Sequence, residues 1–331
     1  MPTVLITPEI LIDVNGPWVP MLEQAGFDLQ HPADRTFTRG LSSEEQSIET
    51  LKHADAVIAG GEHFTRTVLA GLPKLRVIAR CGVGFDRVDV EAATELGIPV
   101  TITPTANHES VAEQAFALLF GVAKSLVVND QQTRAGNWRL TLSEPIRGKT
   151  FGVFGLGRIG RSAAVRAVGM GMPVIATETY PNAEFVRKHG IELVDFETLL
   201  ARSDYLSIHC PLTEETSGLF NRDVFAKMKQ GSVLINTARG KIVVEADLIR
   251  ALQDGPLRGA GLDVFEVEPA KADNPLFQLD NVVISPHLAG TDTASIEAMA
   301  VEAADCILQL FRGEWPSEAV LNGTLRESWK W

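Results

Sequence analysis

The stretch FGVFGLGRIGRSAAVRAVGMGMPVIATETY, residues 151–180, decides the fold. It begins with a short apolar run, passes through three closely spaced glycines at Gly155, Gly157 and Gly160, and ends with a second apolar run before Glu178. This order predicts a strand, a sharp turn into a helix, and a second strand. A strand, helix and strand in succession is the repeating unit of parallel sheets with crossover helices.

The same rhythm of short apolar runs and helical patterns extends along the chain in both directions. Helical patterns separate the runs, as at residues 43–53. The strands expected from this rhythm lie at residues 4–6, 55–59, 76–79, 99–102, 151–154, 173–177, 205–208, 232–236, 258–262 and 282–285. The sequence therefore predicts an α/β fold with parallel sheets.

The length of the chain, 331 residues, exceeds the usual size of one core and favours two domains. Residues 107–134 are apolar and free of proline, which predicts one extended helix or two joined helices. A last helical pattern over residues 293–311 is expected to return to the first domain. We therefore expect a discontinuous domain of residues 1–103 and 291–331, and a second domain of residues 104–290.

The composition indicates a globular protein in a reducing compartment. Hydrophobic residues make up 45% of the chain, which supports packed cores. The formal charge of −12 has no basic tract to offset it, so nucleic acids and anionic membranes are not expected as partners. Cys81, Cys210 and Cys306 are too widely spaced for a disulfide framework or a zinc cluster, and we expect no metal site. Without a recognisable signal or membrane span, we expect the protein in the cytoplasm.

The three glycines are candidates for a nucleotide site, although the bare pattern also marks tight turns that bind nothing. Gly155 suits a sharp turn from strand to helix, Gly157 removes a side chain where a pyrophosphate would approach the backbone, and Gly160 permits close contact between helix and sheet. The amides of Arg158 and Ile159 would then face a diphosphate at the amino terminus of the helix.

Glu178 indicates which dinucleotide this site takes. A carboxylate at the end of the following strand accepts hydrogen bonds from the ribose hydroxyls of NAD, whereas the 2′-phosphate of NADP would meet a like charge. The next residues, Thr179, Tyr180 and Pro181, include no arginine to accommodate such a phosphate. We therefore expect NAD as the cofactor. The alternative is that Glu178 is simply a solvated acid at a strand end.

Three later fragments each place a polar residue beyond an expected strand. They are INTARGKIVVE, AGLDVFEVEP and VVISPHLAG, at residues 235–245, 260–269 and 282–290. Ligands bind at the carboxyl ends of parallel strands, so Arg239, Glu268 and His287 become candidates for one catalytic site.

The chemistry of these three side chains is complementary. Arg239 offers planar, permanently charged donors for a carboxylate and a neighbouring carbonyl oxygen. His287 exchanges protons near neutral pH, as the oxidation of an alcohol or the reduction of a ketone requires, and the Glu268 carboxylate would stabilise its imidazolium form. Taken singly, Arg239 also fits a strand-end ion pair, Glu268 an exposed loop acid, and His287 a helix cap or a core histidine.

Together with these fragments, four further stretches resemble the NAD-dependent D-2-hydroxyacid dehydrogenases, especially the short branch similar to phosphoglycerate dehydrogenase. They read ARCGVGFDRVDVEAATELGIPV, NHESVAEQAFALLFGVAK, GKTFGVFGLGRIGR and HCPLTEET. The resemblance covers nearly the whole chain. It implies two Rossmann-like domains separated by an active-site cleft, dimerisation through the NAD-binding domain, and hydride transfer between nicotinamide and a D-2-hydroxy acid or 2-oxo acid.

The resemblance also assigns roles by position. Arg239 resembles the substrate-binding arginine, His287 the acid/base that also contacts the substrate, and Glu268 its partner. Asp263 matches the aspartate that meets the nicotinamide carboxamide. Residues 209–213 resemble the loop beside the adenosine half of the cofactor, although an ordinary proline-bearing turn fits them too. The remaining cofactor positions implied by the resemblance are Thr237 and Ala238, by their backbone, and His209, Cys210, Pro211, Thr216 and Gly290.

In the first domain, residues 80–84 resemble the loop whose amides receive the substrate carboxylate. Arg80, Val83 and Gly84 are the candidate substrate-binding residues there, with a plain glycine turn as the alternative. The segment RAGNW resembles the region near the dimer contact of the family. Within it, Trp138 is a candidate to reach the active site of a partner subunit, and ordinary packing is the alternative.

Two departures from the family pattern limit the analogy. The branch acting on phosphoglycerate commonly places an arginine after the strand expected here at residues 55–59, where this chain has Gly60, Gly61 and Glu62. A cationic phosphate site is therefore in doubt, with Arg80 left as the one residue that could still contribute to it. The chain also leaves no length after its last helix for the regulatory domain that serine-sensitive phosphoglycerate dehydrogenases append. We therefore expect no feedback control by that route.

Two other functions compete with this one. Formate dehydrogenase of the same superfamily typically pairs its histidine with glutamine, and Glu268 counts against it. An NAD-sensing protein like the co-repressor branch would bind NADH without turnover, whereas the catalytic residues are intact here. The substrate itself stays open among phosphohydroxypyruvate, hydroxypyruvate, glyoxylate and larger 2-oxo acids.

Overall fold

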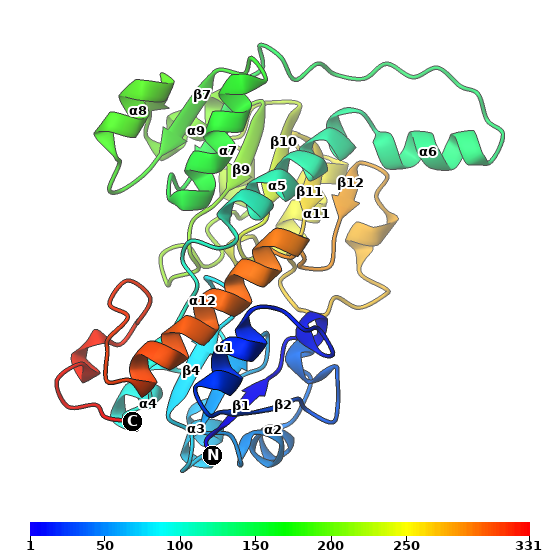
Figure 1. Cartoon of the computed structure of the whole chain (residues 1–331). Coiled ribbons are helices and arrows are strands. Elements are labelled where there is room, and N and C mark those ends of the chain that lie inside the picture. The colour runs from blue at the N-terminus through cyan, green and yellow to red at the C-terminus, as the bar shows by residue number, and fades with distance from the viewer. The chain divides into compact units, whose positions relative to one another are not determined.

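Short runs of buried aliphatic residues form two parallel sheets, each in its own part of the chain. The computed structural model describes residues 1–331 and divides into two units (Figure 1). Unit 1 comprises Met1–Asn107 and Thr291–Trp331, and unit 2 comprises His108–Gly290. The first division therefore lies after Asn107, whereas the sequence analysis places it after residue 103.

The sheet of unit 1 has five parallel strands in the order β2-β1-β3-β4-β5. The strands span Thr3–Ile6 (β1), Asp28–Gln30 (β2), Ala56–Ala59 (β3), Val77–Arg80 (β4) and Val100–Thr101 (β5). Along the three central strands, β1, β3 and β4, side chains alternate between two hydrophobic clusters, so that Val57 belongs to one cluster and Ile58 to the other. Burial on both faces explains why these three strands read as continuous apolar runs.

Helices cover both faces of this sheet. They span Trp18–Gln24 (α1), Glu44–Leu51 (α2), Arg66–Ala70 (α3), Val90–Glu95 (α4) and Thr293–Phe311 (α12), with short 3₁₀ helices at Glu9–Leu11, Phe37–Arg39 and Gly323–Leu325. Helices α1 and α12 contribute to one hydrophobic cluster, and α2, α3 and α4 to the other. Asp292 caps α12 by accepting a hydrogen bond from the Ser295 amide (2.7 Å). Helix α12 has the bounds expected from the sequence.

The sheet of unit 2 has seven parallel strands in the order β12-β11-β10-β9-β6-β7-β8. The strands span Phe151–Phe154 (β6), Val174–Thr177 (β7), Glu192–Leu193 (β8), Tyr205–Ile208 (β9), Ser232–Asn236 (β10), Leu257–Leu262 (β11) and Val282–Ile284 (β12). The chain runs outward from β6 to β8 and then returns to β9 on the other side of β6. Such a reversal marks the ligand crevice of doubly wound sheets, at the carboxyl ends of the strands.

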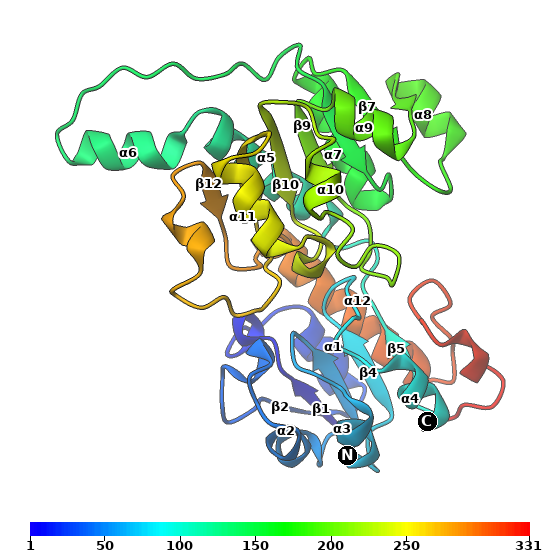
Figure 2. The same cartoon turned by 180° about the vertical axis from the view of Figure 1, so that it is seen from behind.

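Helices also cover both faces of the second sheet, as Figure 2 shows from behind. They span His108–Ala123 (α5), Leu126–Arg134 (α6), Arg158–Gly169 (α7), Ala183–His189 (α8), Phe196–Arg202 (α9), Arg222–Phe225 (α10) and Glu245–Gln253 (α11), with 3₁₀ helices at Gly240–Ile242 and Pro275–Gln278. Helices α5 and α7 share a cluster with Phe151 and Val153, and α9, α10 and α11 form the cluster on the other face.

The long apolar segment after residue 107 forms two helices. Ser125 between α5 and α6 adopts a left-handed conformation (φ 48°), and the two helices are bent by 58°. No single helix is long and apolar enough to cross a membrane. The bent pair of α5 and α6 is long and apolar enough only when its two helices are counted together. Most of the apolar residues of α5 are buried inside unit 2. Helix α6 and the residues that follow it, 135–142, extend away from the rest of unit 2 (Figure 1).

Candidate active site

The glycine-rich turn connects β6 to α7. Gly155 has φ 97°, and a β-carbon there would lie 2.8 Å from the Cys210 amide nitrogen, so no other residue fits. A β-carbon at Gly160 would collide with the Gly155 carbonyl oxygen. Because glycine has no β-carbon, the helix and the turn can approach closely here. At Gly157 the structure places no atom within 4 Å of such a carbon. This open position lies beside the first turn of α7, whose amides have no partner inside the helix.

Glu178 follows β7 and is oriented toward the same turn. One carboxylate oxygen accepts a hydrogen bond from the Leu156 amide (2.7 Å), and the other accepts from the Tyr180 amide (3.1 Å). A carboxylate oxygen has two lone pairs, so each oxygen keeps an acceptor position after these bonds. Glu178 therefore both holds the glycine turn and presents acceptors suited to ribose hydroxyls.

The loop after β9 is held by hydrogen bonds among its own residues and to the end of the strand. His209 Nε2 lies 2.8 Å from Ser207 Oγ, and burial lowers the pKa of His209 to about 4, so the ring is neutral near pH 7. Burial raises the pKa of the Cys210 thiol to about 12, which keeps it protonated. The Thr216 hydroxyl donates to the Pro211 carbonyl oxygen (2.8 Å). In this structure these side chains therefore fix the shape of the loop.

Arg239 leaves the sheet just after β10. The Asn236 side chain fixes this turn, because its amide donates to the Arg239 carbonyl oxygen (2.9 Å) and its oxygen accepts from the Ala238 amide (3.0 Å). A β-carbon at Gly240 would collide with the backbone of Phe265, so only glycine allows the two chain segments to approach. Thr237 is 7% exposed, and its buried hydroxyl has no hydrogen-bond partner. This hydroxyl can therefore form a hydrogen bond with a ligand at the position where the nicotinamide is expected.

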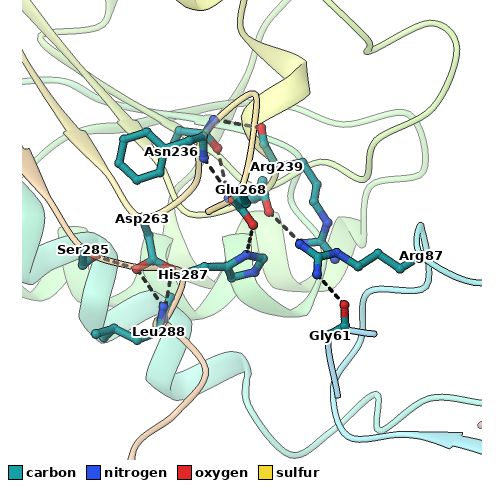
Figure 3. A network of polar contacts seen from close by, with 12 residues as sticks. Gly61, Arg87, Asn236, Arg239, Asp263, Glu268, Ser285, His287 and Leu288 are labelled. Carbon is teal, nitrogen blue, oxygen red and sulfur yellow. Dashed lines mark hydrogen bonds and ion pairs between the residues drawn. The ribbon is translucent and has the colours of Figure 1, made fainter. Parts of the chain in front are cut away.

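Glu268 and His287 form a direct pair, although 19 residues separate them in the chain (Figure 3). Glu268 Oε2 lies 2.7 Å from His287 Nδ1, and the other carboxylate oxygen accepts from the Phe265 amide (3.0 Å). The glutamate side chain is 17% exposed and the histidine side chain 45%. Because a carboxylate only accepts hydrogen bonds, Nδ1 carries a proton in this pair, and Nε2 is the ring nitrogen that the pair does not use.

The loop that carries His287 is anchored to Asp263, which is 0% exposed. The Asp263 carboxylate accepts from the amides of Leu288 (3.0 Å) and Ala289 (2.9 Å) and from the hydroxyl of Ser285 (2.5 Å), and its carbonyl oxygen accepts from the His287 amide (2.7 Å). Figure 3 shows the bonds from Ser285 and Leu288 meeting at the Asp263 carboxylate. The resemblance predicts that this aspartate meets the cofactor; the structure shows it holding the loop that carries His287.

Two residues of α5 that the sequence analysis does not single out also bind this loop. Gln114 Nε2 donates to Ser285 Oγ (2.9 Å), and Ser110 Oγ donates to the Ala289 carbonyl oxygen (2.7 Å). The partners lie 171 and 179 residues apart in the chain, so no local pattern connects them. The only sequence signal is that polar side chains interrupt a helix whose other residues are largely apolar.

In unit 1, the loop after β4 presents backbone donors. The amides of Val83 and Gly84 have no acceptor within the protein, whereas the Gly82 amide donates to Thr103 Oγ1 (2.9 Å). Arg80 is buried and donates to the carbonyl oxygens of Gly60 and Gly84. Its guanidinium therefore holds the two loops of this unit in place.

The loop after β3 is closed by its own contacts. Glu62 is 1% exposed, and its carboxylate accepts from Thr7 Oγ1 (2.6 Å) and from the Gly60 amide. The Gly61 amide donates to Thr38 Oγ1 (2.9 Å), and Arg87 donates to the Gly61 carbonyl oxygen (Figure 3). Both amides of the glycine pair are thus engaged by protein acceptors.

Comparison with known proteins agrees with this geometry. Residues 116–289 match the family model described as D-isomer specific 2-hydroxyacid dehydrogenase, NAD binding domain. A glyoxylate reductase from Korarchaeum cryptofilum is 39% identical over 285 residues, which cover 84% of this chain and 86% of that protein. The chain belongs to the D-isomer specific 2-hydroxyacid dehydrogenase family. These are NAD-dependent oxidoreductases, and NAD is the cofactor of this chain.

Two further relatives define how far the similarity extends. A D-3-phosphoglycerate dehydrogenase from Mycobacterium leprae is 42% identical over 276 residues, and the match covers 82% of this chain but 52% of that protein, so the chain spans about half of this relative. The crystal structure of the TT0316 protein from Thermus thermophilus superposes with a TM-score of 0.85 at 33% identity, covering 96% of this chain and 99% of that one. Its similarity extends over both units.

Proposed function

We propose that this dehydrogenase reduces a short 2-oxo acid to the D-2-hydroxy acid with NADH, and catalyses the reverse oxidation with NAD. The observation that carries the proposal is the pairing of His287 Nδ1 with Glu268 Oε2 at 2.7 Å. This contact directs Nε2 outward as the proton-exchanging atom, in the unit whose glycine turn fits a dinucleotide. The pairing also favours this function over formate oxidation, which requires no proton transfer by a side chain.

The chain's own residues bind the acid and move its proton. When bound, NADH supplies the hydride that reaches the carbonyl carbon. Arg239 binds the carboxylate and the carbonyl oxygen of the substrate, and its positive charge stabilises the negative charge that develops on that oxygen. His287 donates the Nε2 proton to the oxygen, which completes the hydroxyl group. Glu268 stabilises the imidazolium before the transfer; in oxidation each step runs in reverse.

The amides of Val83 and Gly84 are proposed to donate hydrogen bonds to an oxygen of the substrate carboxylate. Adjacent backbone amides without protein acceptors form a suitable site for a small anion. Arg80 supports this loop through its bond to the Gly84 carbonyl oxygen (3.1 Å). This assignment follows the family resemblance, and the unpaired donors of the loop support it.

We further propose that the substrate carries no phosphate group. The loop after β3 contains Gly60 and Gly61 where the phosphoglycerate branch commonly has arginine, and its amides already bind Glu62 and Thr38. The nearby guanidinium groups of Arg80 and Arg87 already bind the carbonyl oxygens of Gly60 and Gly61, and Glu62 places a buried carboxyl group in the same loop. Glyoxylate and hydroxypyruvate fit such a site better than phosphohydroxypyruvate.

The test is a panel of acids assayed with NADH, containing glyoxylate, hydroxypyruvate, pyruvate and phosphohydroxypyruvate, with formate and NAD as a separate arm. We expect the highest kcat/KM for a short unphosphorylated acid, and loss of turnover in His287→Ala. Preference for phosphohydroxypyruvate would overturn the assignment of substrate class. NADH binding without turnover of any acid would instead support a sensor, and oxidation of formate would support a formate dehydrogenase.

The segment from α6 to residue 142 is proposed to form the contact of a homodimer. Trp138, Leu140 and Leu142 are 88%, 100% and 104% exposed, and α6 has no buried residue. Exposed apolar side chains in such number usually mark an interaction surface.

The three unpaired cysteines, Cys81, Cys210 and Cys306, support a reducing compartment such as the cytoplasm.

A further inference from the structure

The catalytic loop is unusual because His287 adopts a backbone conformation that non-glycine residues rarely take. Its φ is 52°, in the left-handed region, and the residue follows Pro286 in an irregular segment. Left-handed non-glycine residues are strained and persist only where surrounding contacts hold them. Asp263 supplies four of these contacts through its carboxylate and carbonyl oxygen.

The bond between Ser285 and Asp263 fixes the direction of a longer hydrogen-bond chain. The Asp263 carboxylate accepts a hydrogen bond from the Ser285 hydroxyl (2.5 Å). A hydroxyl has one proton, so Ser285 Oγ can only accept in its other hydrogen bonds. The 2.9 Å contact between Gln114 Nε2 and Ser285 Oγ must therefore run from the amide to the hydroxyl oxygen. A hydroxyl that accepts one bond becomes a better donor in the next, so Gln114 strengthens the contact that orients Asp263.

Helix α5 is seated firmly enough to serve as the origin of this chain. A β-carbon at Gly261 in β11 would lie 2.7 Å from Leu118 Cβ, and one at Gly121 would lie 3.1 Å from Val283 in β12. These are the two strands whose carboxyl ends lead to Asp263 and Ser285. The close packing fixes the register of Gln114 against the loop, and Ser110 adds a second bond from the same helix to Ala289 (2.7 Å).

We propose that Gln114 is a positioning residue for proton transfer, acting on His287 through Ser285 and Asp263. Its amide donor keeps the loop in the conformation in which Nδ1 meets Glu268 and Nε2 faces the substrate. The inference rests on the proposed function, because it concerns the acid/base of that reaction. A displacement of a catalytic group by about 1 Å can reduce the rate by 10²-fold, so partial loosening of the loop affects turnover before it affects folding.

The test compares Gln114→Met, which removes the donor at similar side-chain length, with Gln114→Lys, which keeps a donor. The matched control is Glu113→Gln, because Glu113 lies on α5, is 65% exposed and pairs with Arg166 rather than with the loop. We expect Gln114→Met to lower kcat for 2-oxo acid reduction about 10-fold, below the 10²–10⁴-fold range typical of removing the acid–base group itself, with little change in KM for NADH. The alkaline limb of its pH–rate profile should move to lower pH, and Gln114→Lys should recover most of kcat.

A second measurement separates this inference from the proposed function. Hydrogen exchange of a peptide covering residues 285–290 reports the amides that Asp263 binds, whether or not any acid is turned over. Faster exchange in Gln114→Met than in wild type and Glu113→Gln supports the inference. Unchanged exchange, or a kcat and pH profile equal to those of Glu113→Gln, would overturn it. If wild type turns over no 2-oxo acid, the proposed function fails, and the exchange result still decides the role of Gln114.

Discussion

At the scale of single residues, Glu268 and Glu178 are held by contacts that leave particular atoms of the candidate site available to ligands. Glu268 uses one oxygen for the Phe265 amide and the other for His287 Nδ1, which leaves Nε2 of the ring for the proposed proton transfer. Glu178 likewise binds two backbone amides and keeps further acceptor positions. The geometry therefore assigns functions to individual atoms as well as to residues.

Replacing His287 with alanine should separate cofactor binding from proton transfer. The substitution removes the proposed proton donor, which is worth about 10²–10⁴-fold in turnover, but it leaves the glycine turn untouched. We expect kcat to fall by that factor while the Kd for NADH, measured by fluorescence titration, changes little. A variant that keeps most of its turnover would show that another group transfers the proton.

Glu178 should determine the preference for NAD over NADP. Glu178→Gln removes the charge that repels a 2′-phosphate but keeps an oxygen for the Leu156 amide, so the glycine turn should remain folded. We expect the ratio of kcat/KM with NADPH to kcat/KM with NADH to rise about 10-fold, equivalent to about 1.4 kcal/mol. Equal efficiency with both cofactors in the wild type would contradict this assignment.

At the scale of elements, the carboxyl ends of the strands of unit 2 carry the site, and the connecting helices and loops set its shape. Most of these elements follow from the sequence, because doubly buried strands read as apolar runs. The sequence analysis does not predict strands β2 and β8: Asp28–Gln30 and Glu192–Leu193 are short edge strands without buried residues. Their pairing depends on a neighbouring strand, so local pattern does not reveal them.

The loop after β9 should make the stability of the protein pH-dependent through His209. Its pKa is near 6.5 in the unfolded chain and about 4 in the folded protein, so only the unfolded chain binds this proton between those values. The free energy of unfolding should therefore fall as the pH decreases from 6.5 to 4, by at most about 2 kcal/mol at pH 5.

Urea unfolding of wild type and His209→Gln at pH 7 and pH 5 measures this contribution. We expect the variant to lose less stability between the two pH values, because glutamine does not titrate. An equal loss in both proteins would show that the ring is already accessible to protons in the folded state.

At the scale of the whole molecule, the exposed segment beyond α5 predicts assembly. A dimer that covers Trp138, Leu140 and Leu142 would remove their apolar surface from water. We expect sedimentation as a homodimer, or a multiple of one, and a weaker association when all three residues are replaced by serine. A wild-type monomer at micromolar concentration with full activity would remove the basis for a contact across subunits.

The sequence predicts the candidate catalytic residues better than it predicts the residues that hold them. Arg239, Glu268 and His287 follow expected strands of one parallel sheet, so topology alone places them at one edge. Gln114, Ser110 and Ser285 act through bonds between distant parts of the chain, and their residue types suit many structural roles. The direction of the hydrogen-bond chain from Gln114 is visible only from the three-dimensional arrangement.

The central claim is that His287, stabilised by Glu268, transfers the proton during reduction and oxidation. Its most direct test is the pair of pH–rate profiles, for reduction and for oxidation, of wild type and Glu268→Gln under conditions where chemistry limits the rate. A neutral amide stabilises imidazolium less than a carboxylate does. The alkaline limb for reduction, which needs the protonated ring, should move to lower pH, and so should the acidic limb for oxidation, which needs the neutral ring. Limbs that stay in place in both directions would contradict the claim.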